Sequence, residues 1–145
     1  MTGPADDAPR PPRPAMFLTP FVQVDGIAFT IGRSELEARL GAPRARGRND
    51  VGLDEWDYGD RVFRFQDGGR LEEVTRPAAV VHLDGIAVPF GSLAAFVAGQ
   101  DADAFERAGY VVSPRFGIAF VPSAPPWVTA LARHAIDAWR ALRVH

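Results

Sequence analysis

The chain of 145 residues contains no cysteine. A disulfide scaffold and a zinc site built on thiolates are therefore excluded. Lysine is absent too, so all 16 basic residues are arginines, which we interpret as the coding bias of a GC-rich genome. Together with 18 acidic residues they give a formal net charge of −2. This charge indicates neither a nucleic-acid partner nor an anionic membrane surface.

Long hydrophobic runs are absent as well. No apolar stretch approaches the about 18 residues of a membrane-spanning helix, and proline and aspartate interrupt any signal-peptide core at the N-terminus. We therefore expect a cytoplasmic protein. Residues 1–15 hold five prolines and predict a disordered extension, and Met16 is an alternative start to Met1.

Motifs of known catalytic chemistry are missing too. The histidines lack metal-ligand spacing, no serine sits in a nucleophile elbow, and there is no glycine-rich phosphate loop. Asp101-Ala-Asp103 lacks the glycine and the terminal glutamate of a calcium loop. The sequence therefore predicts no catalytic, cofactor-binding or metal-binding residue. The residues considered are His82, His134, His145, Ser34, Ser92, Ser113 and Ser123.

What the sequence does contain is an internal repeat. Residues 24–32, with Asp-Gly-Ile-Ala at their centre, recur 59 residues later as residues 83–91. In each copy a serine follows, Ser34 or Ser92, and we expect it to cap a short helix that ends at Gly41 or Gly99. One supersecondary unit used twice is predicted. Its copies span about residues 21–77 and 80–142, within a single domain of residues 16–145.

The segment after the first helix predicts an antiparallel meander. Alternating residues 55–58 and 61–66 flank a Gly59-Asp60 turn, and Asp67-Gly68-Gly69 makes the next turn. The resulting register places Trp56 opposite Phe63, and Phe65 opposite Leu71, on one apolar face with Tyr58. The opposite face carries Glu55, Arg64 and Glu72 in line, with Val62 beside Val74.

The C-terminal third is less regular. Asp101 is expected to cap a helical turn through Phe105. The repeat predicts a strand near Trp127 to Leu131 and a helix from about His134. The apolar spacing up to Leu142 also fits one long helix, which is the alternative.

An acidic cluster surrounds Trp56 and Tyr58 in the first copy, formed by Asp50, Asp54, Glu55, Asp57 and Asp60. It has three interpretations: a solvated face, a binding surface for a basic partner, or acid–base catalysis. We take this region as the candidate partner-binding surface. Its residues are Asp54, Glu55, Trp56, Asp57, Tyr58, Arg61, Arg64 and Glu72.

The turn and core residues of the first copy form a pattern over residues 26–34, 40–43, 56–58, 63–68 and 71–74. This pattern resembles the helix-then-meander unit of the beta-lactamase-inhibitor-protein-like fold, which small outer-membrane-assembly lipoproteins share. It also resembles bacterial proteins of which some act as immunity proteins against secreted toxins. The resemblance covers residues 24–75. The second copy matches only at Gly91, Ser92 and residues 116–120, and a lipoprotein cysteine is missing.

The resemblance implies an α+β fold of tandem helix-plus-antiparallel-meander repeats, forming a curved sheet with helices on one face. It implies fold more than activity. We expect a non-enzymatic immunity protein that binds a cognate toxin or effector and needs no cofactor. The alternatives are a small-ligand or structural module, and a hydrolase that uses Asp54, Glu55 and Asp57.

Overall fold

The computed structural model describes residues 14–141. These residues form three helices and two β-sheets, which confirms the predicted α+β class. The first 13 residues of the predicted disordered extension lie outside the described residues. At its C-terminal end the prediction is wrong, because Ala15 begins strand β1 and the neighbouring Met16 is fully buried.

The smaller sheet has five strands in the order β3-β2-β1-β8-β9. Strands β1 and β8 are parallel, and the remaining pairs are antiparallel hairpins. The strand bounds are β1 Ala15–Thr19, β2 Gln23–Val24, β3 Ile27–Ala28, β8 Val80–Leu83 and β9 Ile86–Pro89.

The two Asp-Gly pairs of the repeat make the same turn. Asp25 and Gly26 have φ values of 50° and 82°, and Asp84 and Gly85 have 51° and 90°. A two-residue turn with positive φ at both central residues is type I′, whose twist matches that of the flanking strands. The sequence repeat therefore encodes one hairpin geometry twice.

A helix follows each hairpin: α2 (Arg33–Leu40) and α3 (Phe90–Gln100). The predicted serine caps are wrong, since Gly32 and Pro89 occupy the N-cap positions and Ser34 and Ser92 lie inside the first turns. Gly32 and Pro89 have extended backbone, and each helix begins at the residue that follows. Each serine therefore already has helical backbone and cannot be the N-cap residue. Gly41, with φ of 81°, ends α2 as predicted, whereas Gly99 lies within α3.

The larger sheet has eight antiparallel strands in the order β10-β11-β12-β13-β7-β6-β5-β4. Each half is a four-stranded meander, and the last strands of the two meanders pair with each other. The bounds are β4 Ala45–Arg48, β5 Asp54–Asp57, β6 Val62–Phe65, β7 Leu71–Pro77, β10 Phe105–Arg107, β11 Tyr110–Ser113, β12 Ile118–Phe120 and β13 Trp127–Leu131.

The C-terminal third differs from expectation at one place. Residues 102–103 form a turn whose Asp103 amide donates to the Asp101 carboxylate, but Phe105 lies in strand β10 and not in the predicted helical turn. The predicted strand and helix near the C-terminus are confirmed, as β13 and α4 (Ala135–Ala141), and the single long helix is excluded.

The register of the first meander is partly as predicted. Trp56 pairs with Phe63, and Phe65 pairs with Leu71. Arg64, however, pairs with Glu73 and not with Glu72, and Val62 pairs with Thr75 and not with Val74. A bulge opposite Arg64 and Phe65 causes the difference, because it inserts one extra residue into β7 and shifts every later partner by one.

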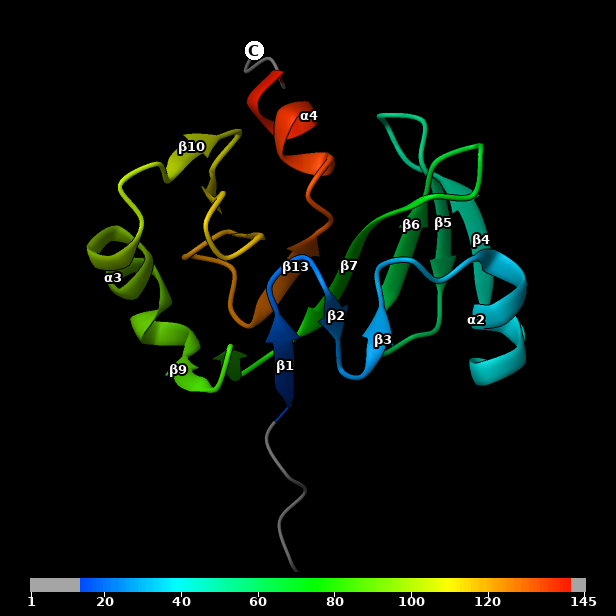
Figure 1. The fold of residues 1–145 in the computed structure, drawn as a ribbon, viewed down its shortest axis with the longest axis horizontal. Coiled ribbons are helices and arrows are strands. Elements are labelled where there is room, and N and C mark those ends of the chain that lie inside the picture. Colours follow the sequence, from blue (N-terminus) through cyan, green and yellow to red (C-terminus); the bar gives the residue numbers. More distant parts are fainter. Residues whose placement is uncertain (1–13, 142–145) are drawn as a thin grey trace, which may run out of the picture.

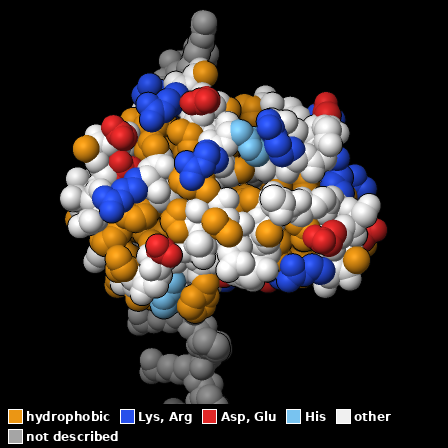
Figure 2. Space-filling view, in the orientation of Figure 1, with side chains coloured by type: hydrophobic (Ala, Val, Ile, Leu, Met, Phe, Trp, Pro, Cys, Tyr) orange, Lys and Arg blue, Asp and Glu red, His pale blue; other side chains and the backbone are white. Residues whose placement is uncertain are grey.

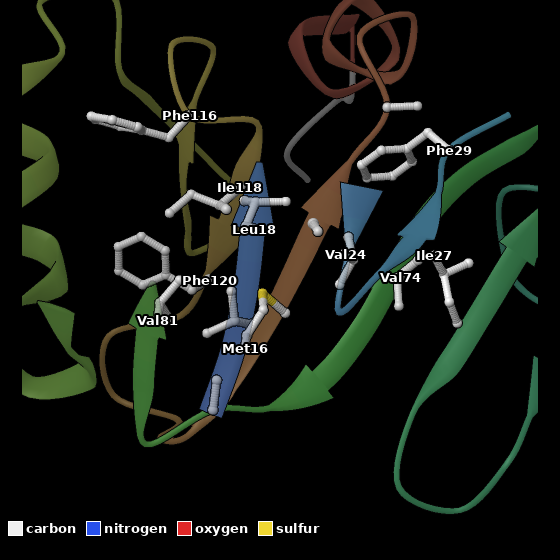
Figure 3. Packing of buried hydrophobic residues seen from close by; sticks show 14 of the residues in the cluster. Met16, Leu18, Val24, Ile27, Phe29, Val74, Val81, Phe116, Ile118 and Phe120 are labelled. Carbon is white, nitrogen blue, oxygen red and sulfur yellow. The ribbon is translucent and has the colours of Figure 1, made fainter. Parts of the chain in front are cut away.

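The two sheets pack face to face, and the core fills the space between them. Met16, Leu18 and Val81 of the smaller sheet meet Val74 and Phe120 of the larger one (Figure 3). Helices α2 and α3 flank the smaller sheet at opposite ends of the molecule (Figure 1).

The expected arrangement of all helices on one face is wrong for α4. This helix packs on the opposite, outer face of the larger sheet, where Ala135 and Ile136 cover Leu131, Val112 and Ala119. The apolar residues on that face of the second meander need a cover that α2 and α3 do not provide.

Buried Asp101 links the end of α3 to the second meander. Its carboxylate accepts hydrogen bonds from the Ser113 hydroxyl (2.7 Å), the Arg115 amide (3.1 Å) and the Asp103 amide (2.9 Å). Burial alone would raise the pKa of Asp101, but these hydrogen bonds and the Arg115 charge hold it below its usual value.

We predict that Asp101→Asn lowers the free energy of unfolding by about 1.5–3 kcal/mol at pH 7, the usual contribution of hydrogen bonds to a charged group. The folded pKa is lowered, so the stabilisation is complete above the unfolded value of 3.8 and is lost as the pH falls through the folded value. Urea unfolding at pH 7 and pH 3 measures both effects. Asp103→Asn, at an exposed position, is the control; equal losses in both variants would contradict the assignment.

The type I′ turns provide a second prediction. An added Cβ at Gly85 meets no atom within 4 Å, so Gly85→Ala tests backbone strain alone. Because L-residues are disfavoured at positive φ, we expect a loss of about 1–2 kcal/mol in thermal or urea unfolding. Gly91→Ala, equally free of contacts but inside α3, is expected to be neutral or stabilising by up to about 1 kcal/mol.

Candidate functional site

A hollow of about 530 Å³ lies on the outer face of the larger sheet, between α4 and the loop of residues 49–53. Its floor comes from four adjacent strands: Glu55 of β5, Arg64 of β6, Thr75 of β7 and Thr129 of β13. The remaining lining residues are Asn49, Asp50, Val51, Leu53, Gln66, Glu72, Glu73, Tyr110, His134, Ala135, Ala138 and Trp139.

The hollow exists because α4 covers only part of the outer face. On the second meander that face is apolar and is buried under α4. On the first meander it carries Glu55, Arg64 and Glu73, which pair across three strands. Helix α4 reaches β7, where Trp139 bonds to Glu73, whereas Glu55 and Arg64 on β5 and β6 stay partly exposed. The edge of α4 therefore forms one wall of the hollow.

Arg64 organises the floor. Its Nε donates to Glu55 Oε2 at 2.6 Å, and its Nη1 lies 3.2 Å from Glu73 Oε1 and 2.6 Å from Thr75 Oγ1. Thr75 in turn shares a hydrogen bond of 2.7 Å with Thr129 on β13. The Arg64 guanidinium therefore connects β5, β6 and β7 directly, and β13 through Thr75. These hydrogen bonds fix the orientation of its side chain.

Glu73 joins the floor to the helical wall. Its second carboxylate oxygen accepts a hydrogen bond of 3.1 Å from the indole nitrogen of Trp139 on α4. Burial raises the pKa of Glu73; the charge of Arg64 and the hydrogen bonds from Trp139 and Arg64 oppose this without cancelling it. The Trp139 ring also packs edge-on against Tyr110, with 5.0 Å between ring centroids.

Glu72, the extra residue of the bulge, is only 4% exposed. Its Oε2 lies 2.9 Å from His134 Nε2, at the start of α4. Burial raises the pKa of Glu72, opposed by Arg70 and reinforced by Glu73, and burial together with Arg70 lowers the pKa of His134. Burial is the largest cause of both shifts.

The other oxygen of Glu72, Oε1, is buried and has no hydrogen-bond partner among the described residues. The nearest cation is Arg70, whose Nη2 is 3.7 Å away and donates instead to the Gln66 side chain. A buried carboxylate oxygen without a donor destabilises the fold by about 1–3 kcal/mol or more, and in a native structure such an atom calls for an explanation.

The eight predicted partner-binding residues separate into two groups. Glu55, Arg64 and Glu72 line the hollow. Trp56 is 3% exposed and belongs to the core, while Tyr58 packs against Phe63 and donates to the Gly41 carbonyl at the end of α2. These two aromatic residues therefore position α2 and do not face the hollow.

The remaining three are also occupied elsewhere. Asp54 binds Arg33 at 3.0 Å and accepts from the Trp56 indole, on the side of β5 away from the hollow. Asp57 accepts from the Gly59 amide within the turn. Arg61 lies over the Phe63 ring. Of the proposed hydrolase trio Asp54, Glu55 and Asp57, only Glu55 lines the hollow.

Sequence reasoning missed the residues that complete the site. Glu73, Thr75, Thr129, His134 and Trp139 come from a bulged strand, its partner β13 and α4. One signal for the bulge was present in the sequence. Glu72 and Glu73 are consecutive acids in an otherwise alternating strand, and a bulge allows both side chains to face the same side of the sheet.

Comparison with protein families, curated proteins and solved structures finds no match to this chain. Among residues 14–141, no helix is long and apolar enough to cross a membrane. The same residues contain no group of three or more histidine or acidic side chains arranged to hold a metal ion.

We predict that Glu72→Gln raises the free energy of unfolding at pH 7 by about 0.5–2 kcal/mol, the usual range of a single stabilising substitution. The folded pKa of Glu72 is raised, so the stability present below the unfolded value of 4.5 is lost as the pH rises through the folded value. Glutamine mimics the neutral form and avoids that loss, and the advantage disappears at pH 4. Glu106→Gln, at an exposed position of β10, is expected to change stability by less than about 0.5 kcal/mol.

Proposed function

We propose that this chain is a non-enzymatic protein-binding module of bacteria, an immunity protein that neutralises a toxin by binding it in the cytoplasm. The observation that carries the proposal is the uncovered outer face of the first meander, with its hollow and its fixed network of charged side chains. Of the residues that line the hollow, Arg64, Tyr110 and Trp139 are of the types that protein interfaces favour.

The repeat supports the same proposal. The order of hairpin, helix and four-stranded meander occurs twice along the chain. We propose that these are tandem copies of the unit that the first copy's turn and core residues resemble, joined into one curved sheet. In such a duplication the scaffold is shared, and a specific function lies where the copies differ. The hollow is such a place, because only the first meander leaves its outer face open.

The charge of the open face favours a basic partner region. The hollow's lining contains four carboxylates, from Asp50, Glu55, Glu72 and Glu73, but only one arginine, Arg64. By contrast, Figure 2 shows a face on which acidic and basic side chains are scattered among hydrophobic ones. An excess of one sign in one concavity steers and orients an oppositely charged partner.

A hydrolase that uses Asp54, Glu55 and Asp57 is not proposed. Acid–base catalysis needs its carboxyl groups around one reacting atom. Asp54 is bound to Arg33 and Asp57 to a turn amide, away from the hollow that Glu55 lines.

Val51 provides a test of the docking face. It is 62% exposed at the rim of the hollow, where the loop leaves an apolar side chain in solvent. Co-expression of this chain is expected to relieve the toxicity of its cognate toxin, encoded by a neighbouring gene. Because Val51→Arg places a charge of the same sign as the proposed basic partner at the interface, without burying it in the fold, we expect at least a tenfold weaker complex and lost protection.

The matched control is Val22→Arg. Val22 is 57% exposed, but it lies in the turn between β1 and β2, in the other sheet. It is expected to leave both protection and affinity unchanged, measured by colony survival and by calorimetry. Protection that is lost equally in both variants, or in neither, would contradict docking on this face, and the absence of any toxic neighbour would contradict the immunity role.

A further inference from the structure

The hollow has an acceptor that nothing within the described chain satisfies. Arg64 is committed to Glu55, Glu73 and Thr75, and Trp139 to Glu73. Those bonds leave Glu72 Oε1 buried, on the wall of the hollow, without a donor. The nearest cation, Arg70 Nη2, is 3.7 Å from this oxygen, beyond hydrogen-bond distance. The Glu72 side chain is 5% exposed, so bulk water compensates for little of the missing bond.

The surroundings of Glu72 select a flat cation. The Trp139 and Tyr110 rings stand together on the same hollow and present aromatic surface beside the carboxylates. A guanidinium bonds to carboxylate oxygens through directed N–H groups and stacks on aromatic faces, and it loses less hydration on burial than an ammonium does. A volume of about 530 Å³ accommodates the whole side chain that carries it.

We propose that the hollow binds the guanidinium group of an arginine that the protein partner inserts, with Glu72 Oε1 as its acceptor. This inference rests on the proposed function, because it assigns the arginine to the bound partner. The inserted cation balances the excess of carboxylates and supplies the missing donor. His134 Nε2 lies 2.9 Å from the other Glu72 oxygen, so the imidazole ring restricts the carboxylate from that side, which makes His134 a positioning residue.

The test uses the full chain and a small probe in place of the partner. N-acetyl-arginine amide is titrated at pH 7 against ¹⁵N-labelled protein, with N-acetyl-citrulline amide, equal in shape and uncharged, as the matched probe. The reporter is the indole N–H resonance of Trp139, which lines the hollow and bonds to Glu73. Trp139→Phe assigns that resonance among the three tryptophans of the chain.

We expect saturable millimolar binding of the arginine probe and at least tenfold weaker binding of the citrulline probe. Glu72→Gln is expected to weaken arginine binding at least tenfold, and Glu106→Gln to leave it unchanged. The amide spectrum away from the hollow shows whether each variant is folded. Equal binding of the two probes, unchanged binding by folded Glu72→Gln, or tighter binding of N-acetyl-lysine amide would overturn the proposal.

This experiment is independent of the toxin. If the arginine probe fails to bind while Val51→Arg still abolishes protection, the arginine site is wrong and the immunity role stands. If the probe binds as expected but no toxin is neutralised, the proposed function is wrong, and with it the assignment of the arginine to a toxin.

Discussion

The pairing of β7 with β13 is the contact on which the rest of the molecule depends. It joins two meanders, each too small to bury its own apolar face, into one sheet of eight strands. Thr75 and Thr129 face each other across this pair and share a hydrogen bond on the outer face. On the inner face, Val74 and Ala130 belong to the core beneath the smaller sheet. One strand pair thus supports both the core and the floor of the hollow.

The two halves of the sheet use this shared frame differently. The second meander has apolar residues on both faces, so α4 must cover its outer side. The first meander has Arg64 and its carboxylate partners there, which tolerate solvent and need no cover. The hollow results from this difference, because it forms at the edge of α4, next to the strands that carry Arg64 and its carboxylate partners. Asymmetry between two copies of one scaffold is therefore the structural origin of the candidate site.

Local sequence patterns predicted much of the first meander. The pairing of Trp56 with Phe63 follows from alternation and a two-residue turn, and both signals lie within eight residues. The same reasoning failed one turn later, because the bulge at Glu72 is favoured by packing and pairing that the alternation does not reveal. Five of the eight predicted site residues proved to position α2, a turn or the core. Exposed-looking acids and aromatic residues are equally suited to those structural roles.

Sequence by itself determined the α+β class, the turns of the first meander and the lack of familiar catalytic motifs, and it left the C-terminal strand and helix open against one long helix. These properties depend on residues that are close along the chain, where turn geometry and side-chain alternation act directly. Tertiary structure alone decided the hollow, since Glu72, His134 and Trp139 meet there from a bulged strand and a helix more than 60 residues apart. The energy that brings them together comes from burying the core between two sheets, and no local pattern encodes which polar residues that packing leaves side by side.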